Sequence, residues 1–372
     1  MNYKTLKDAG DIKGKKVLLR LDFNVPIQDG KITDDYRIKK SLPTLRYLKE
    51  HGAKIIIIAH IEGESDTLKP VFEYLKTSEP VTFCEDCVEN GHACIENMQE
   101  GEMLLCENLR LYDGEKRNDE EFSKKLASLA DIYVNDGFSV SHRKHASVGG
   151  VTKFLPSYAG LQLEAEIENL SKVFNPQKPF IFILGGAKFD TKMPLVEKFL
   201  PLADTIFIGG AMANDFFKAQ GLEVGKSKIA DEPLDLSALL THPKILLPID
   251  IVADGPRGKK TKKPSEVEAD ESIRDVGEET VALLAQRIKD AKTILWNGPL
   301  GYFEGGFKQP TLDIAEVIAH SSAHSVLGGG DTLAAIAELG LEDKYSFVST
   351  GGGAMLDFLS QGSLPGIDAL KK

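Results

Sequence analysis

The sequence has few cysteines that could form disulfide cross-links and lacks long apolar runs that could anchor it in a membrane. It has 4 cysteines and 1 tryptophan in 372 residues, too few cysteines for a disulfide-rich secreted scaffold. No apolar run approaches the roughly 20 residues of a membrane-spanning helix. The opening residues, MNYKTLKDAG, contain no apolar signal core. We therefore expect a cytoplasmic protein that has no membrane partner and keeps its thiols reduced.

Positive charge is also scarce. The chain has 45 Lys and Arg residues against 56 Asp and Glu residues, a net charge of −11. Such a surface repels nucleic acid and anionic lipid, so neither is expected as a general partner. An anionic ligand would need a locally basic pocket.

Short apolar runs alternate with helical patterns along the whole chain. KKVLLRLDF (15–23), FIFILGG (180–186) and KILLPIDIV (244–252) are typical of these runs. They are apolar throughout, which predicts parallel strands covered on both faces. Repeated strand–helix–strand units predict a doubly wound α/β fold. By contrast, the basic segment DGPRGKKTKKPS (254–265) is expected to be an exposed loop.

The length of the chain predicts two domains, each with its own core. The alternation is interrupted around 158–176, where apolar residues follow helical spacing and NPQKP ends the run. We expect an N-terminal domain over 1–160, a connecting helix over 161–175 and a C-terminal domain over 176–354.

Glycine-rich turns follow four of the expected strands in the second half. They are LGGAK (184–188), IGGAM (208–212), LGGGDT (327–332) and STGGGA (349–354). Parallel strands share one carboxyl edge, and a bare turn before a helix offers free N–H groups and a positive dipole end. This rim is therefore predicted to bind phosphates. Lys188 and Lys192 lie one helical turn apart there, and Asp331 is a natural Mg²⁺ ligand.

Cationic side chains end the strands of the first half. Arg37, His60, Arg110 and Arg143 each fall at or just past an expected strand end, and Asp22 and Asn24 follow the first strand. Together they predict a basic pocket for a small anion, held by forked guanidinium groups. Transfer between the two ligands would require a closing cleft that excludes water.

The cysteines raise a separate possibility. Cys84, Cys87, His92 and Cys94 have a spacing that zinc could use. The alternative is that CVENGHACIENM (87–98) is one short helix whose cysteines are packed as apolar residues.

Ten stretches, in order, resemble the phosphoglycerate kinase family over nearly the full length. They are RLDFNVP (20–26), DDYRI (34–38), ENLRL (107–111), YVNDGFSVSHRKHAS (133–147), LGGAKFDTK (184–192), GGAMA (209–213), WNGPLGYFE (296–304), GGGDT (328–332), STGGGA (349–354) and LPGIDAL (364–370). The resemblance implies two Rossmann-like domains, a ligand cleft between them, and a tail over 355–372 that returns to the first domain. It also implies a monomer that transfers a phosphoryl group reversibly between 1,3-bisphosphoglycerate and Mg·ADP, giving 3-phosphoglycerate and Mg·ATP.

The resemblance also implies roles for matching residues. Asp22, Asn24, His60, Arg110 and Arg143 would bind the glycerate phosphate and hydroxyl, and Arg37 would face the transferring group with Lys188 opposite. Lys192 and Asn297 would hold nucleotide phosphates, with Gly329 and Gly330 in the binding turn, and Glu304 would hold the ribose. Gly209, Gly210 and Pro299 would line the adenine site, Asp331 would hold Mg²⁺ beside Thr332, and the helix starting at Gly353, like the turn at Gly330, would direct its N-terminus at the moving phosphoryl group.

Three segments depart from the family pattern. The family usually follows the His60 position with Leu-Gly-Arg-Pro, whereas this chain has IEGES (61–65), with Glu62 and Glu64 and no arginine. Ile273-Arg274-Asp275 replaces Gly-Leu-Asp near the adenine, and GFSVSHR (137–143) replaces Ala-Phe-Gly-Thr-Ala-His-Arg. The lost arginine leaves open a related acyl-phosphate kinase with another carboxylate substrate. A catalytically weak nucleotide-binding protein is the other alternative.

Overall fold

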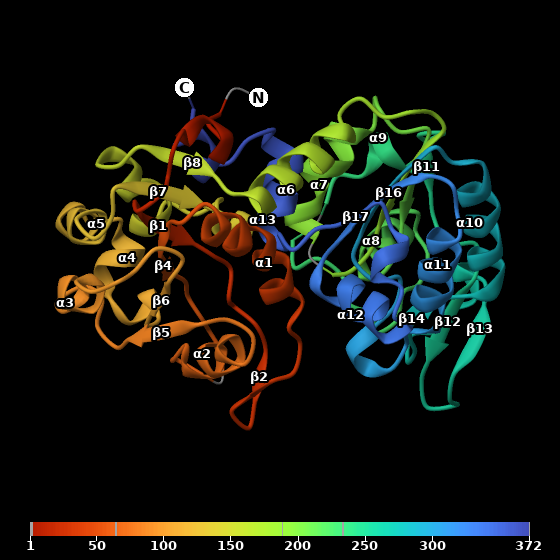
Figure 1. Cartoon of the computed structure of the whole chain (residues 1–372). Coiled ribbons are helices and arrows are strands. Elements are labelled where there is room, and N and C mark those ends of the chain that lie inside the picture. Colours follow the sequence, from red (N-terminus) through yellow and green to blue (C-terminus); the bar gives the residue numbers. More distant parts are fainter. Residues whose placement is uncertain (1–2, 64, 188, 233, 372) are drawn as a thin grey trace. The chain divides into compact units, whose positions relative to one another are not determined.

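The chain forms two compact units, each built around its own parallel sheet (Figure 1). The computed structural model describes residues 3–63, 65–187, 189–232 and 234–371. The first unit runs up to Glu168 and includes the stretch from Gln361 onward, and the second covers Asn169–Ser360. The boundary falls within helix α6 (Leu161–Lys172).

The first unit contains a six-stranded parallel sheet of order β5-β6-β4-β1-β7-β8. Its elements are β1 (Lys16–Arg20), β2 (Ile27–Gln28), β3 (Lys31–Ile32), α1 (Tyr36–Glu50), β4 (Lys54–Ile58), α2 (Lys69–Lys76), β5 (Val81–Cys84), α3 (Gly91–Ile95), β6 (Met103–Cys106), α4 (Asp113–Arg117), α5 (Glu120–Ala127), β7 (Ile132–Asn135), β8 (Ser157–Ala159) and α14 (Pro365–Asp368).

Both faces of this sheet are buried, as the continuous apolar runs predict. Leu19 and Ile57 belong to a core shared with α1 and α2. Leu18 and Ile56, which point to the opposite face, are equally buried. The chain ends meet in this unit, where the N–H of Lys4 donates to the carbonyl of Leu370 at 3.0 Å (Figure 1).

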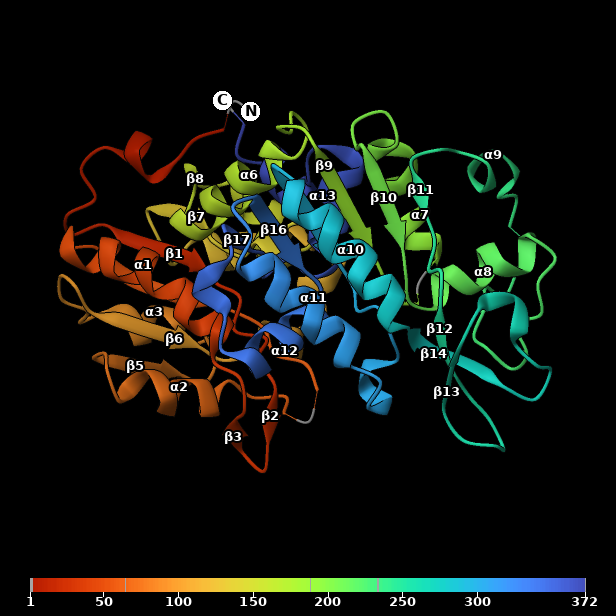
Figure 2. The ribbon, with the colours of Figure 1, turned by 90° about the vertical axis from the view of Figure 1, so that its right-hand side faces the viewer.

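The second unit has a parallel sheet of order β11-β10-β9-β15-β16-β17. Its elements are β9 (Phe180–Leu184), α7 (Phe189–Phe199), β10 (Thr205–Ile208), α8 (Ala211–Ala219), α9 (Ser237–Leu240), β11 (Ile245–Leu246), β12 (Ile251–Asp254), β13 (Lys260–Lys262), β14 (Ser272–Val276), α10 (Glu278–Asp290), β15 (Thr293–Asn297), α11 (Gln309–Ala319), β16 (His324–Gly328), α12 (Gly330–Leu339), β17 (Phe347–Val348) and α13 (Gly353–Gln361). Helices α10, α11 and α12 pack in a row (Figure 2). The two sheets confirm the predicted α/β class with doubly wound parallel sheets.

An antiparallel sheet in the second unit was not predicted. Strands β13, β12 and β14 pair in that order, and the hairpin of β12 and β13 projects from the parallel sheet (Figures 1 and 2). The single strand expected over 244–252 is wrong, because the segment divides into β11 and β12, with Pro248 between them. The loop expected over 254–265 is wrong in part, because β13 lies within it.

The expectation that all thiols are reduced is also wrong for this structure. Cys84 and Cys94 form a disulfide, whereas Cys87 and Cys106 are free and buried. Helix α3 covers only five residues of the segment that was considered as one helix. None of the helices in the described part of the chain combines the length and apolar character that a membrane span requires.

Candidate active site

In the first unit, the sequence-predicted anion ligands lie at the carboxyl ends of parallel strands. Asp22 and Asn24 follow β1, His60 follows β4, Arg110 follows β6 and Arg143 follows β7. Strand β1 lies between β4 and β7, where the strand order reverses direction. Crevices at such reversals are the usual ligand sites of doubly wound sheets.

Arg37 is held beside the end of β1 by two acceptors. Its Nη1 atom lies 3.1 Å from Asp22 Oδ2 and donates to the Asn24 carbonyl at 3.0 Å. The Asp22 carboxylate is buried, whereas the Arg37 side chain remains 30% exposed. The guanidinium is therefore oriented in advance and can still reach a ligand.

His60 is buried among arginines. Burial and the neighbouring charge of Arg20 lower the pKa of His60 far below its ordinary value, so the imidazole is neutral at pH 7. Its Nδ1 lies 3.1 Å from Arg20 Nη2. Because a guanidinium can only donate, Nδ1 accepts, and Nε2 is left to donate to a ligand.

Arg20 itself was missed in the sequence analysis. It is fully buried in β1, and its Nε donates to Ser147 Oγ at 3.0 Å. The Ser147 hydroxyl in turn donates to the buried carboxylate of Glu115 at 2.6 Å. A charged residue within an apolar strand was the available signal, because burying an arginine is costly unless it is paired.

Arg110 provides buried donors that suit an anion. Its side chain is 6% exposed. Among the residues that the structure describes, its Nε and Nη2 atoms have no hydrogen-bond partner. The third nitrogen, Nη1, pairs with the carboxylate of Glu62, whose side chain is 46% exposed. Glu62 thus supplies a negative charge in the segment where the family pattern includes an arginine.

The described residues around Glu62, 61–63 and 65–68, are held by hydrogen bonds. The Glu62 N–H donates to Asn24 Oδ1 at 2.9 Å. Asn108 Nδ2 donates to the carbonyls of Ile61 and Asp66 at 3.0 and 2.8 Å. Lys69 does not replace the missing arginine, because it pairs with Glu85 at 2.9 Å. Glu64 lies outside the described residues.

Two further basic residues follow β7. Arg143 is exposed. Burial, followed by the charges of Arg110 and Arg143, lowers the pKa of His145 to about 4. The set is therefore cationic through its arginines, while both imidazoles are neutral at pH 7.

In the second unit, the predicted glycine turns follow β9, β10, β16 and β17, at the carboxyl edge of one parallel sheet. Gly186 and Gly210 have φ values of +80° and +60°. A Cβ on Gly210 would lie 2.4 Å from the Gly186 nitrogen. Only glycine allows these two turns to meet so closely.

Lys192, Asn297 and Thr332 lie next to these turns and are buried. Lys192 Nζ donates to the carbonyl of Gly185. Asn297 Nδ2 donates to the Gly328 carbonyl at 3.0 Å, and the Gly298 N–H donates to Thr332 Oγ1 at 3.0 Å. An ammonium, an amide and a hydroxyl are thus gathered at one rim.

A cavity of about 550 Å³ opens beside this rim. Of the sequence-predicted residues, Gly210, Pro299, Glu304 and Asp331 line it. Gly209 packs under Leu300 instead, and Gly329 and Gly330 form the turn that starts α12. Gly353 begins α13 and does not line this cavity. Lys188 lies outside the described residues.

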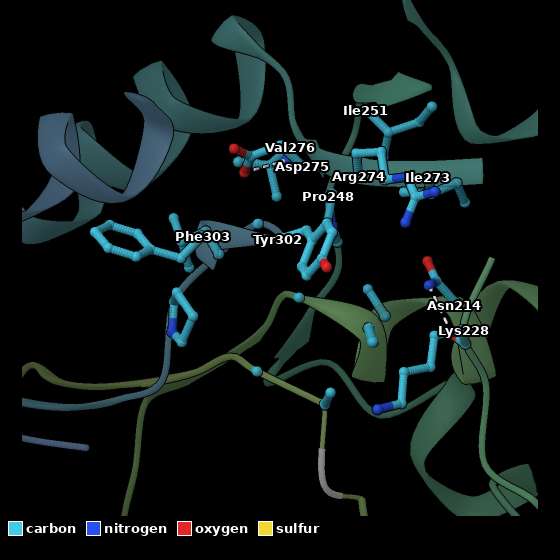
Figure 3. Close-up of a pocket in the computed structure, with 18 of the residues that line it drawn as sticks. Asn214, Lys228, Pro248, Ile251, Ile273, Arg274, Asp275, Val276, Tyr302 and Phe303 are labelled. Atoms are coloured by element: carbon cyan, nitrogen blue, oxygen red, sulfur yellow. Dashed lines mark hydrogen bonds between the residues drawn. The ribbon is translucent and has the colours of Figure 1, made fainter. Parts of the chain in front are cut away.

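Several cavity residues were not predicted. Asn214, Lys228 and Tyr302 lie around its opening. Arg274, which the resemblance placed near the adenine, extends from β14 toward it (Figure 3). The Arg274 guanidinium lies 5.5 Å from the centre of the Tyr302 ring. Asn214 and Lys228 were missed because they lie beyond the GGAMA stretch (209–213), where no further motif was recognised.

Asp275 is the most strongly perturbed group at this cavity. Burial raises its pKa to about 8. Its Oδ1 accepts from the Val276 N–H at 2.9 Å. Its Oδ2 is buried without a hydrogen-bond partner in the described ranges. The carboxyl is therefore largely protonated at pH 7.

Comparison with known proteins identifies the relatives of this chain. The phosphoglycerate kinase family model matches residues 6–362. The chain belongs to the phosphoglycerate kinase family. A phosphoglycerate kinase of Dictyoglomus turgidum is 44% identical over 396 aligned positions, covering all of both proteins. That of Pelotomaculum thermopropionicum is 41% identical, covering 100% of this chain and 99% of the relative.

Solved structures of the family agree with the fold. The phosphoglycerate kinase structure from Coxiella burnetii matches with a TM-score of 0.85 at 36% identity, covering 99% of each chain. The Pyrococcus horikoshii OT3 structure matches with a TM-score of 0.87 at 32% identity, covering 99% of this chain and 98% of that one. Membership of the phosphoglycerate kinase family does not favour the other acyl-phosphate kinase or the weak nucleotide binder.

Proposed function

We propose that this chain catalyses reversible phosphoryl transfer between 1,3-bisphosphoglycerate and Mg·ADP, giving 3-phosphoglycerate and Mg·ATP. The observation that carries the proposal is that each unit gathers groups suited to an anion at the carboxyl edge of its parallel sheet. The site of the first unit is rich in arginine, and that of the second unit is built from glycine turns beside a cavity.

The first unit would bind 3-phosphoglycerate. Arg110 offers two buried nitrogens that lack partners in the described structure. His60 offers an Nε2 donor and Arg143 an exposed guanidinium. Forked guanidinium donors match phosphate oxygens in geometry and charge. Asp22 and Asn24 would form hydrogen bonds with the glycerate hydroxyl.

The second unit would bind the nucleotide. Lys192, Asn297 and the turns before α8 and α12 would hold phosphates, with Gly329, Gly330 and Thr332 at the start of α12. Gly209, Gly210 and Pro299 would border the adenine, and Glu304 would bind the ribose. Lys188 would hold the transferring phosphoryl group, together with the N-terminus of α13 at Gly353.

Mg²⁺ would be held by Asp331. The Asp331 carboxylate is a hard oxygen ligand in the first turn of α12, and Asp331 lines the cavity. Mg²⁺ needs few protein ligands because substrate phosphates and water complete its coordination. When bound, the ion would neutralise charge on the nucleotide phosphates.

Catalysis would need no covalent enzyme intermediate. The protein's own contribution is to position both substrates for in-line transfer and to place positive charge where negative charge develops. Arg37 is oriented for that task by Asp22 and Asn24. We also propose that the enzyme acts as a cytoplasmic monomer, which sedimentation of the purified protein and fractionation of cells would test.

Calorimetry on paired variants tests whether each unit binds its own substrate. Arg110→Ala should lose 3-phosphoglycerate binding and keep Mg·ADP binding, whereas Lys192→Ala should do the reverse. Lys198→Ala, on the exposed face of the same helix as Lys192, is the matched control and should keep both. Loss of both ligands in either folded variant would contradict two separate sites.

A further inference from the structure

All 4 cysteines of the chain gather at one edge of the first sheet. Cys84 and Cys106 occupy partner positions on the parallel strands β5 and β6, so their side chains leave the same face. Cys87 neighbours the Cys106 thiol and is the first cause of its raised pKa. Cys84 is joined to Cys94 by the disulfide. Cys106 therefore links the two pairs into a single four-sulfur cluster.

The pairing within this cluster is informative. Cys84 and Cys87 form a Cys-x-x-Cys motif, but neither pairs with the other. Each contacts a cysteine from elsewhere, Cys94 of α3 or Cys106 of β6. A dithiol redox motif closes on itself, whereas a tetrahedral metal site combines a Cys-x-x-Cys turn with two sulfurs from other segments. The observed pairing follows the second pattern.

The turn inside the motif is already shaped. Asp86 Oδ1 accepts from the N–H groups of Val88 and Glu89, both at 3.1 Å. Cys84, Cys87 and Cys106 are each at most 1% exposed. Structural zinc sites are likewise closed, with four protein ligands.

His92, considered as a ligand from its spacing, does not belong to this cluster. Its side chain is exposed, and its Nε2 lies 3.1 Å from Ser128 Oγ. The fourth soft donor is instead Cys106, twelve positions beyond Cys94 along the chain. Sequence spacing could not identify it, because strand pairing rather than a local turn brings it to the cluster.

We propose that the reduced form of this cluster binds one zinc ion through Cys84, Cys87, Cys94 and Cys106. With the disulfide closed, the described residues hold no ready group of three or more metal ligands. An external dithiol would reduce the Cys84–Cys94 bond, giving two thiols and its own disulfide. Zn²⁺ would then form four Zn–S bonds and release four protons.

Within the Cys84–Cys94 pair, the rearrangement required is small. Zn–S bonds of about 2.3 Å in a tetrahedron place sulfurs about 3.8 Å apart. The two sulfurs of a disulfide, about 2 Å apart, would therefore separate by less than about 2 Å. The contact with Cys87, followed by burial, raises the pKa of the Cys106 thiol. A bound cation would offset the cost of the buried thiolates. Zinc would tie the edge strand β5 to β6 and α3.

Cobalt substitution tests the proposal on the full chain, independently of kinase activity. The protein is reduced without oxygen by a phosphine, titrated with Co²⁺ and then with Zn²⁺. We expect one ion per chain, with thiolate-to-cobalt charge-transfer bands and tetrahedral visible bands that Zn²⁺ abolishes. His92→Ala should behave like the parent protein. Cys106→Ser should lose more than about 100-fold in affinity, since it removes a ligand itself.

The cadmium-113 chemical shift of the parent protein gives an answer even if Cys106→Ser does not fold. A shift typical of four sulfur ligands supports the proposal, and one typical of three sulfurs and one nitrogen overturns this ligand set. Failure of the reduced protein to take up Co²⁺ or Zn²⁺ would overturn the site. So would oxidation to a second disulfide, Cys87–Cys106, with no metal uptake at any stage.

Discussion

Arg37 is the side chain whose charge bears most directly on the proposed transfer step. Its contacts with Asp22 and the Asn24 carbonyl orient the guanidinium before any ligand binds. Arg37→Ala should lower kcat by about 10²–10³, the cost of removing one oriented donor from a transition state. The KM for 3-phosphoglycerate should change far less. Steady-state kinetics would separate the effects on kcat and KM. An unchanged kcat would show that Arg37 is only a surface charge.

Glu62 is expected to weaken acceptor binding. Its carboxylate occupies Nη1 of Arg110, which an incoming phosphate would otherwise use. Glu62→Gln removes that competitor and one like charge. Because Glu62 is half exposed, we expect a gain near 1 kcal/mol, or about fivefold in the Kd for 3-phosphoglycerate.

Calorimetry with 3-phosphoglycerate measures this effect of Glu62. Glu85→Gln is the matched control, because it breaks the exposed pair with Lys69 and should leave the Kd unchanged. Weaker binding by Glu62→Gln would show that Glu62 positions Arg110 rather than competing for it.

The sequence reveals which side chains gather at the carboxyl edge of the first sheet, because each follows a strand with a recognisable apolar run. It does not reveal their partners. The Glu62–Arg110 pair joins two segments 48 positions apart, and the contact of Arg20 with His60 depends on β1 lying beside β4. Such contacts follow from strand order, which apolar pattern alone does not determine.

At the scale of elements, parallel strands were easier to predict than the antiparallel sheet. Strands buried on both faces can be apolar throughout, as in β9, which reads FIFIL. Strand β13, in contrast, reads KTK and is mostly exposed, so its composition resembles that of a loop. This sheet supplies one wall of the cavity, so Ile273-Arg274-Asp275 was placed there only through the family resemblance.

Strand β14 is expected to weaken the preference of the cavity for ATP over GTP. Arg274, beside Tyr302, brings a donor-rich charged group to the cavity where the family pattern has leucine (Figure 3). A guanidinium can donate hydrogen bonds to the carbonyl oxygen of guanine. We expect this contact to be as favourable for guanine as apolar packing is for adenine. We expect kcat/KM for GTP to lie within about tenfold of that for ATP, a difference of about 1.4 kcal/mol.

Arg274→Leu should restore preference for ATP, with kcat/KM compared for both nucleotides at saturating 3-phosphoglycerate. Discrimination above about 100-fold in the parent protein would show that the cavity is shaped for adenine despite Arg274.

At the scale of the whole molecule, Asp275 should make stability depend on pH. Burial raises its folded-state pKa to about 8 from 3.8. Between these values the folded chain keeps a proton that the unfolded chain has lost. The contribution of Asp275 to stability is therefore complete near pH 4 and declines as pH rises toward 8. The substituted side chain in Asp275→Asn cannot ionise, so this variant should not show that decline in stability.

Urea unfolding at several pH values measures the effect. Trp296, the only tryptophan, is buried in β15 of the same unit and reports its unfolding by fluorescence. The unfolding free energy of the parent protein minus that of Asp275→Asn should fall steadily from pH 4 to pH 8. A constant difference would mean that Asp275 titrates normally in the folded protein.

The central claim is that this chain transfers a phosphoryl group between a carboxylate and a nucleotide. The most direct test is a coupled assay of the purified protein with 3-phosphoglycerate and ATP, with and without Mg²⁺. We predict turnover that requires all three components and falls sharply in Arg37→Ala. Absence of turnover above background, in protein that calorimetry shows to bind both 3-phosphoglycerate and Mg·ATP, would contradict it.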